Sequence, residues 1–278
     1  MLLSSVIHLK ALESGSIPQY MGAAIRSEFL TWMGISDAEE PHSADEPREE
    51  TEMHGGNQLR PYTVSDLQGV SNAQKGFNRI EAGQRAWFRV TTLNEEQSQK
   101  FQNAVLPTVV DRVFQLDRVK FQVTNAAEAG KHPGARATSY QALVDKYLKS
   151  DSPVSDTLNI EFKSLTTFHA GDFYLPLPVP KLILRSWLMR WNRFSSAILP
   201  FEARDIREAN FALSQHDIQT DTVEYRGISW IGFKGKCAFR IFAREAYWAH
   251  LCNLLAEFSF YCGTGHKTTY GLGQTWRA

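Results

Sequence analysis

The first half of the chain alternates between strand-like and helix-like patterns of apolar and polar positions. Residues 1–12 alternate as a strand does, and residues 18–34 carry apolar side chains at helical spacing. Gly34 is a typical end for that helix, because glycine adopts the left-handed conformation of a C-terminal cap without strain. Two further strands are predicted, one at residues 62–65 and one at residues 84–93.

A second helix and a fourth strand complete this pattern. Asn94 follows the strand at 84–93 and is a suitable N-cap for a helix that begins at Glu95. Phe121 and Val123 lie in the strand expected after that helix. The order strand, helix, strand, strand, helix, strand is that of one ferredoxin-like unit.

The second half repeats much of this order. Its predicted elements are a strand at 158–162, a helix at 181–194, strands at 223–233 and 237–242, and a helix at 244–260. Pro180 suits the first turn of the first helix, where its missing N–H costs nothing. Lys234-Gly235-Lys236 is predicted to be the turn that joins the two strands. No residue-level repeat links the halves, so the duplication is inferred from the elements alone.

We therefore expect an α+β protein made of two tandem ferredoxin-like, or RRM-like, βαββαβ domains. The polar stretch 150–153 is the predicted boundary, which gives domains at residues 1–150 and 151–278. The first domain includes an acidic loop at 36–58 and a connector before the boundary. The second ends in a glycine-rich loop at 263–273.

Charge is unevenly distributed along the chain. The formal net charge is zero, but residues 37–52 hold eight acids and one base, which leaves 22 acids against 29 lysines and arginines elsewhere. The rest of the chain is therefore modestly basic, which is compatible with a phosphate-binding face. The three cysteines, Cys237, Cys252 and Cys262, have neither disulfide nor zinc spacing and are expected in the core of a cytoplasmic protein. No apolar run is long enough to cross a membrane.

The segment 263–274 carries the most specific pattern in the chain. It places four glycines around His266 and Lys267. Such a backbone can approach a phosphate chain closely, because glycine permits positive φ and exposed N–H groups bind anions. A nucleotide-binding loop would need glycine in place of His266, and a dinucleotide fingerprint would need glycine in place of Thr268. The segment is thus either a phosphate-binding loop or a C-terminal hairpin with glycines at its turns.

This segment resembles the C-terminal glycine-rich loop of the RAMP superfamily, in particular the CRISPR-associated endoribonucleases of the Cas-six type. Other stretches resemble that family in the expected chain order: residues 22–30, 59–67, 158–168, 179–194 and 227–233. Leu165 stands where the family commonly has proline. The resemblance covers nearly the whole chain and is most specific in the C-terminal loop, whereas the catalytic region resembles the family least.

The resemblance implies a metal-independent endoribonuclease that uses no cofactor, binds CRISPR repeat RNA and cleaves precursor crRNA. In that reaction the 2′-hydroxyl of the RNA attacks the phosphate and leaves 2′,3′-cyclic phosphate and 5′-hydroxyl ends. A general base accepts the hydroxyl proton, a general acid protonates the leaving oxygen, and a cation stabilises the phosphorane. The sequence agrees to the extent that it shows no histidine pair at metal-ligand spacing.

The resemblance also suggests catalytic residues. His54 matches the family's histidine before the second strand, and an ordinary histidine pKa of about 6.5 suits a base; an exposed loop histidine is the alternative. Arg60 follows it, and His42 is a competing base. Arg26 stands where relatives can have a helix histidine; it cannot be a base, but it could grip the phosphate or simply lie on the helix surface. Tyr20 is a weaker candidate that is expected to pack.

The proposed RNA-binding residues come from the glycine-rich loop, the predicted 234–236 turn and their surroundings. They are Gly263, Gly265, His266, Lys267, Gly271, Gly273, Lys234, Lys236, Arg240 and Arg185. For the two lysines of the turn, a solvated turn is the alternative interpretation. Four tryptophans are predicted to be core residues, namely Trp187, Trp191, Trp230 and Trp248. Four histidines are interpreted as isolated structural side chains: His8, His169, His216 and His250.

The expected partner is CRISPR repeat RNA or precursor crRNA. Subunits of a CRISPR effector complex and a second copy of the chain are further options, and no membrane partner is expected. Because Arg26 replaces a helix histidine, a non-catalytic RAMP subunit that binds repeat RNA is an alternative function. A subunit that makes only protein contacts is a second alternative, and it predicts no salt-dependent affinity for RNA.

Overall fold

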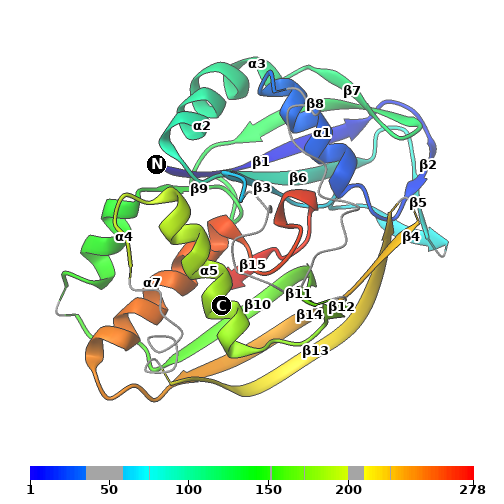
Figure 1. Ribbon diagram of the computed structural model, residues 1–278. Helices are drawn as coiled ribbons and strands as arrows, with labels where there is room; N and C mark the ends of the chain where they lie inside the picture. Colours follow the sequence, from blue (N-terminus) through cyan, green and yellow to red (C-terminus); the bar gives the residue numbers. More distant parts are fainter. Residues whose placement is uncertain (36–58, 75, 151, 172, 200–209, 226) are drawn as a thin grey trace.

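Two antiparallel sheets, one in each half of the chain, form the framework of the computed structural model (Figure 1). The structure describes residues 1–35, 59–74, 76–150, 152–171, 173–199, 210–225 and 227–278. The last part of the chain, drawn in red, runs between the two sheets. This segment therefore lies where both halves can contact it.

The first sheet has the strand order of a ferredoxin-like fold. Its strands, in spatial order, are β3 (Tyr62–Val64), β6 (Arg85–Thr92), β1 (Leu2–Ala11), β8 (Val119–Ala127) and β7 (Val113–Leu116), and β9 (Arg136–Thr138) also pairs with β1. Numbered along the chain, the four strands β1, β3, β6 and β8 lie in the order 2-3-1-4. This order brings the first and third strands together at the centre of the sheet, as the split β-α-β unit requires.

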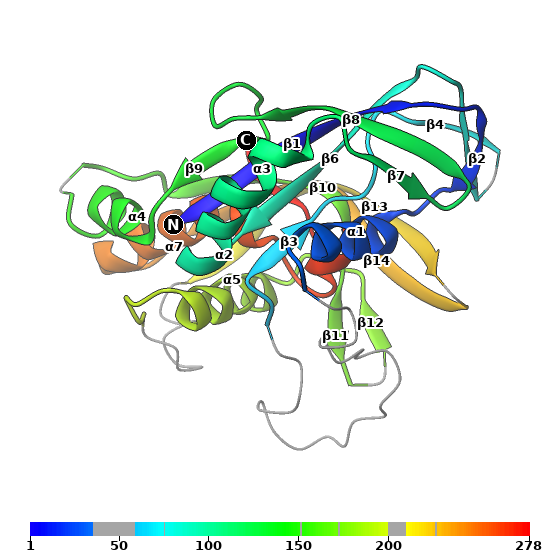
Figure 2. The ribbon, with the colours of Figure 1, turned by 90° about the horizontal axis from the view of Figure 1, so that it is seen from above.

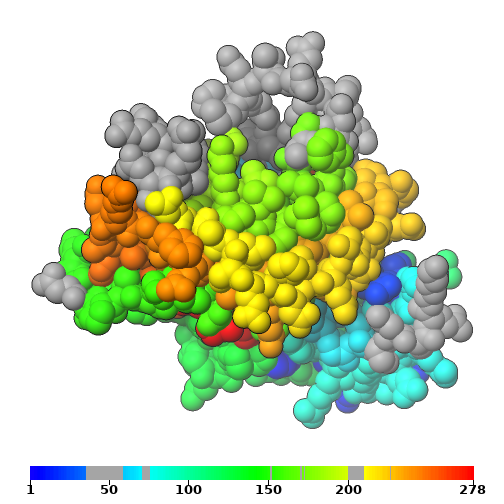
Figure 3. All heavy atoms as spheres, turned by 90° about the horizontal axis from the view of Figure 1, so that it is seen from below, coloured from blue at the N-terminus to red at the C-terminus, as the bar shows by residue number. Residues whose placement is uncertain are grey.

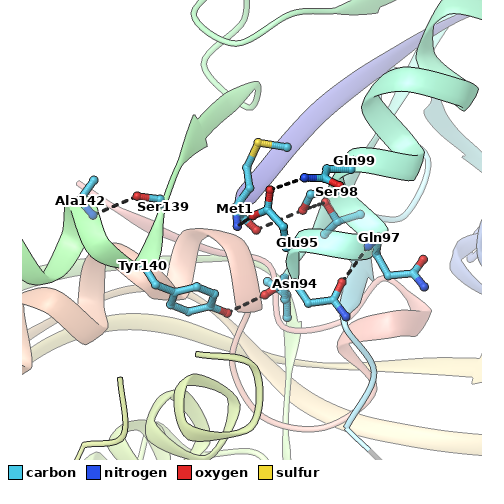
Figure 4. Close-up of polar contacts among 11 residues, drawn as sticks. Met1, Asn94, Glu95, Gln97, Ser98, Gln99, Ser139, Tyr140 and Ala142 are labelled. Carbon is cyan, nitrogen blue, oxygen red and sulfur yellow. Dashed lines mark hydrogen bonds and ion pairs between the residues drawn. The ribbon is translucent and has the colours of Figure 1, made fainter. Parts of the chain in front are cut away.

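Two helical segments pack on this sheet (Figure 2). The first is α1 (Gly22–Trp32), and the second runs through α2 (Glu95–Lys100), a π-helical stretch (Phe101–Val105) and α3 (Leu106–Val109). Ile25, Phe29 and Phe101 are fully buried in the core beneath them. The predicted N-cap is confirmed, because Asn94 Oδ1 accepts a hydrogen bond from Gln97 N at 2.9 Å (Figure 4).

The second sheet repeats the same topology. Its strands, in spatial order, are β13 (Phe211–Tyr225), β14 (Ile228–Ile241), β10 (Thr157–Thr166) and β15 (Thr275–Arg277), and its main helices are α5 (Pro180–Phe194) and α7 (Ala246–Cys262). Numbered along the chain, these strands again lie in the order 2-3-1-4. The predicted α+β class and the tandem ferredoxin-like arrangement are therefore confirmed.

Smaller elements complete the structure. They are the three-stranded sheet of β2 (Gly15–Pro18), β5 (Phe77–Ile80) and β4 (Ser71–Gln74), the hairpin of β11 (Phe168–Ala170) and β12 (Phe173–Leu175), α4 (Tyr140–Tyr147), and a 3₁₀ turn at Thr268–Tyr270. The α4 helix precedes the predicted domain boundary, and its Leu143 and Tyr147 pack in the core of the second half. Tyr140 also donates a hydrogen bond to Leu93 O at 2.7 Å (Figure 4). The boundary itself stays a prediction.

The turn predicted at Lys234-Gly235-Lys236 is wrong. All three residues lie inside β14, which is one continuous strand paired with β13 along its length. Gly235 is needed there for another reason: a Cβ at this position would lie 2.2 Å from Asp217 O on β13. A glycine that lets two strands approach closely looks, in the sequence, like a glycine that makes a turn.

The core predictions hold. Each of the four tryptophans predicted to be internal is at most 7% exposed. The three cysteines are buried thiols without disulfide partners, and burial raises the pKa of each to about 12. Within the described residues, no helix is long and apolar enough to cross a bilayer.

Candidate functional site

Side chains of α5 hold the start of the glycine-rich segment 263–274, here called the tail segment. Gly265 N donates to Ser186 Oγ at 2.8 Å, and Gly265 O accepts from Arg190 Nη2 at 2.7 Å. Trp187 Nε1 donates to Thr264 Oγ1 at 2.7 Å. These three residues of α5 are buried, so their hydrogen bonds are shielded from water and fix the backbone of the tail segment.

The tail segment also lies tightly against the end of β10. His266 N donates to Thr167 O at 2.8 Å, and Gly273 N donates to Leu165 O at 2.8 Å. Gly265 has a φ of +78°, and a Cβ there would lie 2.2 Å from Thr167 O. Gly265 is therefore required for the approach of one protein backbone to another, and this requirement alone accounts for a glycine at that position.

The first half of the chain contacts the other side of the tail segment. Gln274 Nε2 donates to Val64 O at 2.9 Å, and Gln274 Oε1 accepts from Arg89 Nε at 2.9 Å. Gly271 forms a parallel bridge with Ser65, and the Tyr20 hydroxyl donates to Tyr270 O. The tail segment thus joins the two ferredoxin-like halves through hydrogen bonds to each.

Two cations lie against the ring of Tyr270. Arg26 Cζ is 4.9 Å from the ring centroid and Lys267 Nζ is 5.0 Å from it, while Lys267 Nζ is also 5.9 Å from the ring centroid of Trp230. Arg26 is only 6% exposed, so the surface-arginine interpretation of this residue is wrong. Lys267 is more exposed than Arg26 and has a left-handed backbone at φ +56°. The ring of Tyr270 therefore holds two cations close to the middle of the tail segment.

Two rings of the β11–β12 hairpin lie beside His266. Its ring centroid lies 5.7 Å from that of His169 and 5.9 Å from that of Tyr174, and the centroids of His169 and Tyr174 are 5.5 Å apart. His169 is exposed and the other two are partly exposed. The prediction that His169 is an isolated structural side chain is wrong. We call these three residues the ring cluster.

Asp66 links the start of α1 to the strand beside the tail segment. Its Oδ1 accepts from Met21 N at 2.7 Å and from Leu67 N at 2.9 Å. Burial of the carboxyl raises its pKa to about 6, although the backbone N–H groups that it accepts from act in the opposite direction. Burial, more than the nearby Asp66, also raises the pKa of Tyr20 well above its ordinary value, so Tyr20 is a neutral packing residue, as expected.

The predicted RNA-binding residues Lys234, Lys236 and Arg240 lie on β14, outside the tail segment, and each has an acid close to it. Lys234 Nζ is 2.6 Å from Asp221 Oδ2 on β13, and Arg240 Nη2 is 3.6 Å from Asp156 Oδ2. Lys236 lies between Glu161 and Asp217 in the register of the sheet. Figure 3 shows β13, in yellow, along the surface of the second half. Neighbouring carboxylates reduce the positive potential that these side chains could offer a phosphate.

The remaining predicted residues divide into two groups. Arg60, two residues before β3, and Arg185 on α5 are partly exposed. His54 and His42 lie outside the described residues. Across the parts of the chain that are described, no group of three His, Cys, Asp or Glu side chains could hold a metal ion.

Sequence reasoning missed two features of this site. His169 and Tyr174 are far from His266 in the chain, and only the folded β11–β12 hairpin brings the three rings together. A local signal exists, because Gly171 separates two short runs that could pair as strands, but it does not indicate what the hairpin contacts. Arg190 is the second: it lies on α5 beside the predicted contact Arg185, but it is buried and its guanidinium donates to Gly265 O.

Comparison with known proteins gives a consistent picture. Residues 160–275 match the family model described as CRISPR-associated endoribonuclease Cas6. A Cas6 solved as a product complex is 23% identical to this chain, with a TM-score of 0.73 and 100% of both chains covered. No match was found among curated protein sequences.

Two further solved structures extend the likeness in fold. Thermus thermophilus Cas6 is 20% identical, with a TM-score of 0.67, and the comparison covers 100% of this chain and 98% of that one. A Cas6-related protein from Pyrococcus furiosus is 13% identical, with a TM-score of 0.60 and coverage of 100% and 99%. The resemblance seen in the sequence is confirmed by the family match over residues 160–275 and by the fold over the whole chain.

Proposed function

Because residues 160–275 match the Cas6 family and the whole chain has the Cas6 fold, we propose that this protein binds CRISPR repeat RNA and cleaves precursor crRNA. The observation that carries this proposal is the family match, which includes the whole tail segment. Solved Cas6 structures that resemble this chain include a product complex and a substrate-mimic complex. The chemistry gathered at the tail segment, two cations and a group of imidazole and phenol rings, suits an RNA strand.

The proposed reaction is transesterification within the RNA strand. The 2′-hydroxyl attacks the neighbouring phosphate, the bond to the 5′-oxygen breaks, and the products carry a 2′,3′-cyclic phosphate and a 5′-hydroxyl. A histidine of the segment before β3, His54 or its competitor His42, would accept the proton of the 2′-hydroxyl. Arg60, six residues after His54, would help to hold the phosphate.

The two cations at Tyr270, Arg26 and Lys267, differ in how easily they could contact a phosphate of the RNA. A bidentate grip on phosphate by Arg26 would require the guanidinium to leave the Tyr270 ring, since only 6% of the residue is exposed. Lys267 faces the same ring and is more exposed, so its ammonium can contact a phosphate without losing its position. We therefore give Lys267 the direct contact and assign Arg26 to holding Tyr270 in place.

One experiment tests the proposal. The protein is incubated in EDTA with a labelled RNA that carries a CRISPR repeat, and a matched RNA has a 2′-deoxy nucleotide at the cleavage position. We expect cleavage of the first RNA to cyclic phosphate ends, no cleavage of the second, and loss of activity in His54→Ala or in His42→Ala. Equal cleavage of both RNAs would exclude the mechanism. Tight binding without cleavage would favour the non-catalytic RNA-binding alternative.

A further inference from the structure

The backbone holds the three side chains of the ring cluster in fixed relative positions. His169 and Tyr174 lie directly opposite each other in the antiparallel β11–β12 hairpin. His266 is fixed from the other side, because its backbone N donates to Thr167 O at 2.8 Å and Gly265 before it is held by α5. Because their backbones are fixed, these rings can form a surface prepared before a ligand arrives.

The rings do not stack on one another. The interplanar angle is 84° between His169 and Tyr174, 47° between His169 and His266, and 37° between Tyr174 and His266. Core aromatic residues of this protein are almost fully buried, whereas His169 is exposed and its two neighbours are partly exposed. Ring faces that remain accessible to solvent can be covered by another flat group.

The cation next to the ring cluster suggests what that group is. Lys267 follows His266 in the chain, and its ammonium lies against Tyr270 and Trp230. A nucleotide has both features that this surface would bind, a flat base for the rings and a negative phosphate for the lysine. Unpaired bases of RNA are commonly bound by stacking on aromatic side chains. We propose that His169, Tyr174 and His266 form a stacking site for one unpaired base of the bound RNA, whose phosphate contacts Lys267. This inference rests on the proposed function.

Sequence alternation within the hairpin supplies a matched control. Phe173 is 63% exposed and precedes Tyr174 on β12, so its side chain points to the opposite face of the hairpin. It is an exposed aromatic residue on the same strand but not a member of the ring cluster. Phe173→Ala therefore tests whether an effect comes from the ring cluster or from the hairpin as a whole.

The test uses repeat RNAs that carry 2-aminopurine at successive unpaired positions, because the fluorescence of this base falls when it stacks. In the parent protein we expect quenching at one position. Tyr174→Ala and His169→Ala should abolish that quenching and weaken binding about 5–150-fold, since stacking of a base contributes roughly 1–3 kcal/mol. Tyr174→Phe keeps the ring, and Phe173→Ala removes no member of the ring cluster. Because no stacking contact is lost in either variant, both should bind within about twofold of the parent. Thermal melting of each variant checks that it is folded.

The outcomes separate this inference from the proposed function. A parent protein that binds and cleaves repeat RNA, with Tyr174→Ala and His169→Ala unchanged in affinity and quenching, would overturn the stacking site and leave the proposed function intact. An equal loss in Phe173→Ala would also overturn it, because the ring cluster would then have no special role. A parent protein that binds no repeat RNA would overturn both.

Discussion

Two short sequences in this chain combine glycine with lysine, and the structure uses them in opposite ways. Gly265-His266-Lys267 lies in an irregular segment between the two halves, and its lysine rests against aromatic rings. Lys234-Gly235-Lys236 lies inside a regular strand, and Lys234 contacts a carboxylate at 2.6 Å. The comparison shows that a glycine beside a lysine does not by itself indicate an anion site.

Gly265 and Gly235 have the same structural role, and the two segments differ in the side chains that surround their lysines. A Cβ at Gly265 would lie 2.2 Å from Thr167 O, and a Cβ at Gly235 would lie 2.2 Å from Asp217 O. Both glycines therefore permit a close approach between two segments of backbone. The strand places acids beside its lysines, whereas the rings of Tyr270 and Trp230 lie beside Lys267 of the tail segment. A phosphate would have to compete with Asp221 for Lys234, whereas at Lys267 it would meet an ammonium that lies against aromatic rings.

The largest effect is expected from Gly265→Ala. The added Cβ would collide with Thr167 O, and the φ of +78° is strained for alanine. We expect a loss of about 3–5 kcal/mol in the free energy of unfolding, or a displaced tail segment, because both a steric and a conformational cost apply. Urea denaturation measures the loss in the free energy of unfolding, and a slower cleavage of repeat RNA would report a displaced tail segment.

Gly130→Ala is the control for this change. Gly130 has nearly the same φ, +83°, but no atom lies within 4 Å of the position of its Cβ. Alanine there should cost only the conformational part, about 1 kcal/mol. If the two variants are equally stable, the close approach of the tail segment to β10 is not what requires Gly265.

The sequence predicts the helices and most strands because their signals are local, but the strand predicted at 223–233 is wrong, since those residues are divided between β13 and β14. Apolar periodicity, the Asn94 cap and Pro180 in the first turn of α5 each indicate an element without knowledge of its neighbours. The 2-3-1-4 strand orders then follow from the element order, because few topologies connect such elements without crossing. The resemblance to a known family adds to this prediction and does not replace it.

The candidate site depends on contacts between distant parts of the chain, which the local pattern does not specify. Nothing in the sequence around Arg26 indicates that Tyr270 will cover it, and nothing around His169 indicates that His266 will lie beside it. The Lys234-Gly235-Lys236 turn fails for the same reason, since the close approach of β13 is not visible in the sequence of β14. The RNA-binding roles assigned to the glycines and lysines stay predictions.

The second prediction contrasts the buried carboxyl beside the tail segment with the exposed one on β13. Burial raises the Asp66 pKa to about 6, so folding favours its protonated form and the parent should lose stability as pH rises from about 4 to 6. Asp66→Asn keeps an oxygen that can accept from Met21 N and removes this titration. Relative to the variant, the parent should lose about 2 kcal/mol between pH 4 and pH 7, a difference that denaturation at each pH measures.

Asp221 should behave in the opposite way. The hydrogen bond from Lys234 lowers its pKa, so this pair contributes to stability above the ordinary aspartate pKa and loses that contribution as pH falls. Since both side chains are about half exposed, the change should be small. A parent and an Asp66→Asn variant with the same pH dependence would show that Asp66 is not the group responsible.

The third prediction compares the two lysines directly. Lys267→Ala should weaken binding of repeat RNA about 5–10-fold and reduce the slope of log affinity against log salt by about one, because one phosphate contact is lost. Lys234→Ala should change the affinity by less than about twofold, since its charge is already balanced by Asp221. Fluorescence anisotropy at several salt concentrations provides both quantities. Equal losses in the two variants would mean that the strand, as well as the tail segment, contacts RNA.

The smallest effect is expected when the acid beside the strand lysine is removed. Asp221→Asn frees Lys234 from its carboxylate partner without changing a buried residue. It removes about one negative charge next to β14, so the electrostatic potential there becomes more positive. If Asp221 is what keeps Lys234 from contacting RNA, repeat RNA should bind about twofold more tightly at low salt, and the gain should vanish at higher salt through screening. Stability should change by less than about 1 kcal/mol, because an exposed ion pair contributes little. An unchanged affinity at low salt would show that RNA does not come near β14, so that distance from the RNA, and not its acids, makes this strand different.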